Sequence, residues 1–421
     1  MATLRLGLTD HGHLPQSAPA FFGALHEPGM KARFRREKNN TWSGFGELAG
    51  TEVGPVQSQL EALGFMPEGS ASGVFDYRTQ SAVRLFQEYV RSAEGHADIG
   101  KPDGIVGRLT RTHLDRWVRE GDRVSWKSHR VPAAPWFRLL KAYRERTAGS
   151  PGPLQEVVQR RFAQSVQPDT LPASEWNVSK EQVHLIGIRR GATADWKIKL
   201  NNDVFILLAG GGVFTFFGST DPNPNMTSKP PFLLPGQHLY RFGWHKLSQL
   251  EKCYRAFRPR SAGVLVMRDR DNRRSTVDLK DERILASAVD RAPNPTINIH
   301  WSGRHTSSWS AGCQVISGGG YINHHDELVD CWEHASAGYA GLGKRTRGAY
   351  NVLLDLITTL SPDPRVAVGD LLHYTLINEH DLDLEPTLGR GAVRAPLQRG
   401  MEILERHDPA RFKQYRMHLE A

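Results

Sequence analysis

Cysteine is scarce in this sequence, with three residues among 421, at positions 253, 313 and 331. Three cysteines cannot build the framework of paired bridges that staples a small secreted domain. Two interpretations stay open. Either Cys253 and Cys331 pair in an oxidising compartment, or all three cysteines are reduced. In both cases Cys313 is a free thiol.

Long apolar runs are also missing. No stretch approaches the ~18 consecutive apolar residues of a membrane span. The first residues, Met-Ala-Thr-Leu-Arg-Leu-Gly, lack the apolar core of a secretory signal. The sequence therefore predicts no membrane span and a chain made in the cytoplasm without a signal peptide.

Motifs for common cofactors are absent too. The sequence contains neither the glycine pattern of a phosphate-binding or dinucleotide-binding loop nor the His and acid spacing of zinc peptidases. Asp10, His11 and His13 lie close together, but no further ligand follows at a recognisable spacing, so we interpret residues 1–50 as a polar N-terminal arm. We expect no cofactor and no metal site.

The overall composition is that of an ordinary globular protein, with 39% hydrophobic and 24% charged residues. The 40 glycines and 25 prolines favour short strands and loops over a helical bundle. The length suggests about two or three domains. A formal net charge of +9 favours a polyanionic partner, which could be nucleic acid, anionic lipid or cell wall. The basic patch between Lys31 and Lys38 does not choose among these.

The stretch from Asn298 to Ser317 carries the clearest chemistry. His300 ends one short apolar run and Cys313 opens another, with a loop of Ser, Gly, Thr and Trp between them. Alternation at period two predicts strands, so we expect both residues at neighbouring strand ends. A cysteine thiol with a pKa near ~8.5 is mostly protonated at neutral pH, and a histidine within hydrogen-bond reach can take its proton. The pattern indicates a Cys/His nucleophile pair.

Two neighbouring residues complete this candidate site. Gly312 would let the backbone turn so that the amides of Gly312 and Cys313 point at a developing oxyanion. Ser310 would orient the loop or the imidazole through its hydroxyl. The plain alternative is a small buried cysteine and a hydrogen-bonded strand histidine.

The pattern Ser-x-Gly-Cys, preceded by Ile-x-Ile-His, resembles the signature of the L,D-transpeptidase (YkuD-like) cysteine enzymes of peptidoglycan. Four residues match that signature: His300, Ser310, Gly312 and Cys313. Ala311 stands where the family has histidine, and Gln314-Val315 replaces the aliphatic-arginine pair. The resemblance implies Cys313 as nucleophile, His300 as base and a catalytic domain over residues 176–380.

Residues 51–118 show helical spacing and two similar turns. Gly73 is followed six residues later by Thr79, and Gly104 by Thr110. We expect each glycine to permit a tight turn and each threonine to cap the next helix. The segment resembles a peptidoglycan-binding domain of the three-helix type, which implies peptidoglycan as a partner.

The remaining chain divides by its periodicity. Residues 119–175 are predicted to be a Pro-rich linker with helices. From Gln182 onward the pattern is that of strands, with a hairpin at Gly210 to Gly212. Helices are predicted at His325–Glu333 and Gly348–Thr359, a late strand at Leu371–Ile377 and a C-terminal helical tail at 381–421. The predicted fold is α+β multidomain: a small all-α module and a mostly antiparallel β-sheet domain with flanking helices.

Other residues near the Cys/His pair are candidate substrate contacts. His305 is an alternative base within the loop. Arg304 is suited to holding a stem-peptide carboxylate as a bidentate partner. Further candidates come from the loop and from the strand expected to face it: Trp301, Trp309, His238, Tyr240 and His245.

Together these features predict a peptidoglycan-targeting cysteine enzyme that acts on stem peptides through a Cys313 thioester. Transfer to an amine would be L,D-transpeptidation, and transfer to water would be L,D-carboxypeptidase or endopeptidase cleavage. Alternatives are a non-catalytic peptidoglycan-binding protein and a glycan hydrolase that uses Asp326 or Glu327. Nucleic acid is not predicted as a partner, because neither recognised module binds it.

Such an enzyme would meet its substrate outside the cytoplasm. Because no signal peptide is predicted, we expect action in the periplasm or cell wall after specialised secretion. A secretion apparatus and an immunity protein are then candidate partners of a secreted antibacterial effector.

Overall fold

The computed structural model describes residues 3–10, 35–36, 42–43, 52–190, 203–223, 226, 229–246, 249, 252–268, 282–304, 310–341, 345–362 and 371–419. Four residues singled out from the sequence, His11, His13, His305 and Trp309, lie outside these ranges, as do Lys31 and Lys38 at the ends of the basic patch. Two short strands, β1 (Arg35–Arg36) and β2 (Trp42–Ser43), pair within the first 50 residues.

A helical module follows. It contains α3 (Val53–Ala62), α4 (Tyr77–Ser92), the 3₁₀ helix η1 (Ala97–Ile99) and α5 (Arg108–Glu120). The residues that face its core are apolar at helical spacing, as predicted, and include Val56, Leu60 and Phe86. The predicted all-α module is therefore present at the predicted place.

The weak duplication in this module has a hydrogen-bond basis that the sequence pattern did not include. The side chain of Gln57 donates to Thr79 Oγ1 (2.8 Å) and accepts from the Gly73 N–H (2.8 Å). Gln87 makes the same two hydrogen bonds in the second copy of the repeat, with Thr110 Oγ1 (3.1 Å) and the Gly104 N–H (2.9 Å). Both glycines have positive φ, as predicted.

The predicted capping role of the threonines is wrong. Asp76 caps α4, because its side chain accepts from the Thr79 N–H (2.7 Å), and Gly107 occupies the corresponding position before α5. Each threonine instead ties its helix to a buried glutamine, and this satisfies polar groups inside a small core.

Within the region predicted as an N-terminal arm, residues 3–10 pack against the module. Leu4 pairs with Val106, and Thr9 pairs with Val74. Asp10 accepts from three backbone N–H groups at the start of α3, at residues 52, 53 and 54 (2.8 to 3.1 Å). A carboxylate at this helix end stabilises the exposed N–H groups.

A nine-stranded sheet forms the larger domain, in the order β10-β8-β7-β13-β3-β4-β5-β11-β12. Among these strands only β13–β3 and β10–β11 are parallel, so the predicted, mostly antiparallel sheet is confirmed. Because β10 pairs with both β8 and β11, eight strands close into a barrel and β12 lies outside it. The strands are β3 (His184–Arg189), β4 (Asp203–Ala209), β5 (Gly212–Ser219), β7 (Gly236–His245), β8 (Tyr254–Pro259), β10 (Ile299–Trp301), β11 (Gln314–Ile322), β12 (Leu328–Asp330) and β13 (Leu372–Asn378).

Most local predictions in this domain hold. The hairpin through Gly210 and Gly211 joins β4 and β5, and both glycines have positive φ. The predicted helix at 348–359 is α9 (Ala349–Leu360). The predicted helix at His325–Glu333 is wrong: β12 lies there and pairs with β11, after a turn in which Asp326 has a φ of 60°.

Helices cover the outside of the barrel. The region predicted as a linker with helices forms α6 (Ala134–Gly149) and α7 (Pro153–Phe162), and Trp136 and Leu140 of α6 share one apolar cluster with Ile186 and Ile188 of β3. Val393 and Leu397 of the predicted helical tail join the same apolar cluster. The tail forms α10 (Gly391–His407) and α11 (Pro409–Leu419), and the other short elements are η2 (Ala173–Glu175), β6 (Pro231–Leu233), β9 (Val266–Arg268), α8 (Glu282–Ala288), η5 (Tyr339–Gly341) and η7 (Glu379–Leu384).

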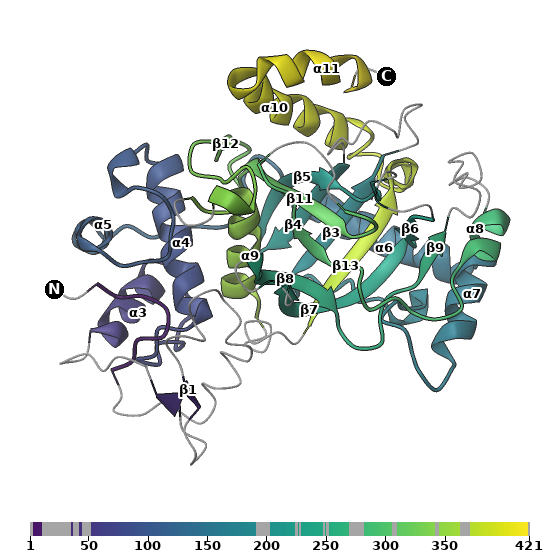
Figure 1. The fold of residues 1–421 in the computed structure, drawn as a ribbon, viewed down its shortest axis with the longest axis horizontal. Helices are drawn as coiled ribbons and strands as arrows, with labels where there is room; N and C mark the ends of the chain where they lie inside the picture. The colour runs from purple at the N-terminus through teal and green to yellow at the C-terminus, as the bar shows by residue number, and fades with distance from the viewer. Residues whose placement is uncertain are drawn as a thin grey trace.

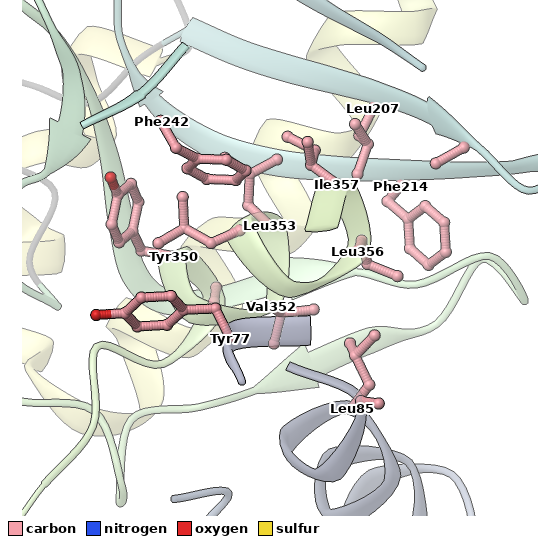
Figure 2. Packing of buried hydrophobic residues seen from close by; sticks show 14 of the residues in the cluster. Tyr77, Leu85, Leu207, Phe214, Phe242, Tyr350, Val352, Leu353, Leu356 and Ile357 are labelled. Carbon is pink, nitrogen blue, oxygen red and sulfur yellow. The ribbon is translucent and has the colours of Figure 1, made fainter. Parts of the chain in front are cut away.

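Helix α9 joins the two domains. In Figure 1 it lies between α4 of the helical module and the strands of the barrel. Figure 2 shows Leu353 and Ile357 of α9 directed at the strands, and Val352 and Leu356 directed at Leu85 of α4. One continuous apolar core therefore runs from the helical module through α9 into the barrel.

The described residues bear on two further predictions from the sequence. All three cysteines are free thiols, so Cys253 and Cys331 do not pair. Within the described ranges, none of the helices combines the length and the hydropathy that crossing a membrane requires.

Candidate active site

The parallel pair β10–β11 positions the predicted nucleophile and base. Ile299 pairs with Gln314 and His300 with Val315, so Asn298 lies beside Cys313, one residue before β11. The side chain of Gln314 is buried and accepts from the Tyr374 hydroxyl (3.0 Å) in the barrel. Because side chains alternate along a strand, Asn298, His300 and Cys313 share the opposite face. Cys313 and His300 are diagonal neighbours on that face.

The Cys313 sulfur is held by two backbone groups. It accepts from the Asn298 N–H (3.3 Å), and the thiol donates to the Thr296 carbonyl (3.3 Å). Burial raises the pKa of the Cys313 thiol, while the Asn298 N–H, the Ser310 hydroxyl and nearby positive charges act in the opposite direction. Of the three cysteines only Cys313 is partly exposed; the other two are fully buried.

The His300 ring is oriented by its Nδ1. Nδ1–H donates to the Trp301 carbonyl (2.9 Å), and the Tyr254 hydroxyl donates to the same carbonyl (3.3 Å). In a neutral imidazole this leaves Nε2 as the nitrogen that can accept a proton. Burial lowers the pKa of His300 to about 4, so the ring is neutral at pH 7.

A second histidine lies against the first. His245 at the end of β7 stacks on His300 with ring centroids 4.2 Å apart and an interplanar angle of 18°. The Asn298 side-chain amide donates to His245 Nδ1 (3.1 Å). The register puts Ala256 beside His300, and its small side chain leaves room for the stacked ring. Burial and the neighbouring His300 lower the pKa of His245 to about 2.

Ser310 orients the loop and not the imidazole. Its Oγ accepts from the Cys313 N–H (2.6 Å) and the Gly312 N–H (3.2 Å). The two amides expected to hold an oxyanion therefore bind the serine hydroxyl in this structure. Gly312 is also required for a different reason than predicted: a Cβ there would lie 2.4 Å from Pro231 Cγ, so the glycine permits a close approach.

Two basic residues that the sequence analysis did not single out, Arg258 and Lys246, lie near the Cys313 sulfur. Register places Arg258 of β8 beside Asn298, and its side chain passes over Gly243, where a Cβ would lie 2.9 Å from Arg258 Cδ. Lys246 follows His245 and has a φ of 61°, which is unusual for a residue with a side chain. Both positive charges favour the Cys313 thiolate. The sequence contains no signal for either residue, and in the structure the positive φ distinguishes Lys246.

Three predicted substrate contacts are not at this face. Trp301 is buried, with 3% of its surface exposed, and follows Ile299 on the interior face of β10. Tyr240 is fully buried on the face of β7 opposite to His245. The guanidinium of Arg304 lies over the Trp332 ring (4.6 Å) and donates to the Trp332 carbonyl (3.2 Å). His238, also considered, is buried and bound to Thr170 (3.0 Å).

Comparisons with known proteins support part of the sequence interpretation. Residues 49–114 match the family described as putative peptidoglycan binding domain, which confirms the resemblance of the helical module. No curated protein matches the chain.

One solved structure has weak similarity to the chain. It is a fused Zn-dependent amidase/peptidase/peptidoglycan-binding domain-containing protein from Clostridium acetobutylicum, with 13% identity over 78% of this chain and 96% of its own. Its TM-score of 0.23 is too low to support a conclusion about fold or function.

Proposed function

We propose that this protein is a peptidoglycan-directed cysteine enzyme that cleaves or transfers stem peptides through a Cys313 thioester. The helical module at residues 49–114 would hold the enzyme on the cell wall. The Cys313–His300 pair on one face of β10 and β11 is the observation that carries the proposal.

The proton transfers follow from the way each ring nitrogen is bound. His300 Nε2 takes the proton of the Cys313 thiol, and the sulfur attacks the carbonyl carbon of a stem-peptide amide. The C–N bond then breaks, and Nε2–H gives its proton to the leaving amine. An acceptor amine or water attacks the thioester in the second half, and the thiol is restored.

Three features of the site support these steps. Cys313 and His300 lie on the same face of adjoining strands, two residues apart in register. The hydrogen bond from the Asn298 N–H to the sulfur stabilises the thiolate as it forms. Stacked His245 keeps the His300 ring in one orientation.

The oxyanion requires a change at Ser310. Its hydroxyl occupies the N–H groups of Gly312 and Cys313, so these amides can receive an oxyanion only after Oγ turns away. Substrate binding would make this exchange, since an oxyanion is the stronger acceptor.

The charge near the sulfur suits an acidic substrate. Arg258 and Lys246 both contribute positive potential at Cys313. Stem peptides end in carboxylates, and a guanidinium on a strand can bind one with two parallel hydrogen bonds. These two residues replace Arg304 in the proposed recognition of the substrate.

The proposal is tested by incubating the purified protein with peptidoglycan and resolving the muropeptides by mass. We expect shortened or newly cross-linked stem peptides. Unchanged muropeptides, together with retention of the protein on the insoluble wall, would instead indicate a non-catalytic wall-binding protein. New glycan ends with intact stem peptides would indicate a glycan hydrolase and would also contradict the proposal.

The pH dependence of the reaction should report on His300. Because its pKa is lowered to about 4, the imidazole stays able to accept a proton throughout mildly acidic conditions. We therefore expect kcat/KM to be level from about pH 5 to 8 and to fall tenfold per pH unit below about pH 4. An acidic limb near pH 6.5, measured on a soluble muropeptide with the folded state checked at each pH, would contradict the buried neutral base.

A further inference from the structure

A cluster of three potential metal ligands lies away from the candidate active site, where the two domains meet. Glu88 comes from α4 of the helical module, and Cys331 and His334 come from the turn that follows β12. One ligand atom from each residue lies within 4.8 Å of the other two. All three side chains are buried.

The distances in this cluster suit a single small cation. Cys331 Sγ is 3.9 Å from Glu88 Oε1, and His334 Nε2 is 3.7 Å from Glu88 Oε2. Tetrahedral zinc with bonds of about 2.0–2.3 Å to N, O and S places neighbouring ligand atoms about 3.4–3.7 Å apart. All three ligand atoms lie within 4.8 Å of one another, so movements of about 1 Å would complete the coordination.

His334 supplies a second, independent observation. Its side chain is 9% exposed, and its buried Nε2 has no hydrogen-bond partner in the described part of the chain. Buried polar atoms are normally paired, so an unpartnered ring nitrogen that faces a thiol and a carboxylate indicates a missing ligand.

The local backbone holds two of the ligands in place. The N–H groups of His334 and Ala335 both donate to the Cys331 carbonyl (3.2 and 2.8 Å), which closes a tight turn. The resulting Cys-x-x-His spacing brings both side chains to one side, as in the short ligand spacings of structural zinc sites.

We propose that Glu88, Cys331 and His334 bind one zinc ion that links the helical module to the barrel domain. A thiolate, an imidazole and a carboxylate together favour zinc over calcium or magnesium, which prefer oxygen ligands. Water fills the fourth position. Binding releases one proton, from the Cys331 thiol.

The Cys331 thiolate and the Glu88 carboxylate each carry one negative charge, which together match the two positive charges of the ion. Arg91 adds one further positive charge beside Glu88. Arg91 already pairs with Glu88 through Oε1 (2.7 Å). A carboxylate has about four lone-pair positions, so Glu88 can bind Arg91 and the metal together. Arg91 then orients a metal ligand from outside, as such partners commonly do.

Cobalt substitution of the full-length protein tests the proposal directly. The metal-free protein is titrated with Co²⁺, and the near-ultraviolet thiolate-to-cobalt charge-transfer band is recorded. We expect one Co²⁺ per chain, displaced by one Zn²⁺, and a higher melting temperature of the zinc-loaded protein. X-ray absorption of the wild-type zinc form should show one sulfur ligand at about 2.3 Å.

Variants show whether the metal binds at Cys331 or at Cys313, which also has a neighbouring histidine. The Cys313→Ser variant should keep the charge-transfer band, and Cys331→Ser should lose it. Glu88→Gln and His334→Gln should weaken Co²⁺ binding at least tenfold. A wild-type protein without the band or the sulfur ligand would overturn the proposal, as would a band lost with Cys313 and kept without Cys331. If Cys331→Ser does not fold, the wild-type X-ray absorption and the His334→Gln titration still decide.

Discussion

Replacing Cys313 by serine is expected to abolish the change in muropeptides, with a loss of kcat/KM on the order of 10⁴-fold or more. A serine hydroxyl is a much weaker acid than a thiol, and the neutral His300 with its lowered pKa is too weak a base to ionise it. The loss should come from the chemistry and not from the fold, because Cys313 is only partly buried and serine has a similar size.

The chain supplies controls for this prediction. Cys253 and Cys331 are fully buried, so iodoacetamide applied to the folded protein should label Cys313 alone and inactivate it in parallel. Binding of Cys313→Ser to the insoluble wall should match wild type, since residues 49–114 are untouched. A Cys313→Ser protein that still produces the wild-type muropeptides would exclude the thioester.

The positions of the candidate nucleophile and base beside two strands could be predicted because the signal for the strands is local. His300 and Cys313 each lie beside a short apolar run, and the structure gives both runs as strands. The partners of the sulfur could not be predicted in this way. Asn298 and Arg258 come beside Cys313 only through the register of three strands, which long-range pairing decides.

The sequence analysis proposed Trp301 and Tyr240 as substrate contacts, but the alternation of side chains along a strand already places both on the other face. Ile299 is a core residue of β10, and a period of two puts Trp301 on its face and His300 on the other. The same rule separates Tyr240 from His245 on β7. A residue close in sequence to His300 or Cys313 therefore need not share their face of the sheet. Whether it lies an even or an odd number of positions along the strand decides this.

Local preference failed where tertiary pairing decided the structure. Residues 325–333 contain enough helix-forming residues to suggest a helix, yet Val329 pairs with Tyr321 of β11. Asp326 occupies the turn before this strand and forms an ion pair with Arg399 of α10 (2.6 Å). The sequence alone contains no sign that β11 needs an edge partner here.

The two domains were predicted as separate units with a linker between them, but their packing makes them one unit. The Arg84 side chain on α4 forms a two-point ion pair with Asp355 on α9 (2.8 Å from Nε to Oδ2). Asp355 is 1% exposed and lies on α9 between the buried residues Val352 and Leu356. A buried pair of this kind fixes how the two surfaces meet.

Replacing Arg84 by alanine is expected to lower the free energy of unfolding by about 3–5 kcal/mol, because it leaves the Asp355 carboxylate buried without its guanidinium. Burial raises the pKa of Asp355 and Arg84 lowers it, so the variant should raise the pKa of Asp355 further. In calorimetry we expect the melting temperature to fall by several degrees and the transition to split, as the helical module separates from α9 before the barrel unfolds.

Two further variants distinguish this explanation from a general effect of losing an arginine. Arg138 forms the same two-point geometry with Glu385 (2.9 and 3.0 Å), but Arg138 is 54% exposed, so Arg138→Ala should shift the transition much less. The double variant Arg84→Met with Asp355→Leu removes both charges and should recover most of the lost stability. Equal shifts for Arg84→Ala and Arg138→Ala would mean that the two domains do not depend on this pair to stay together.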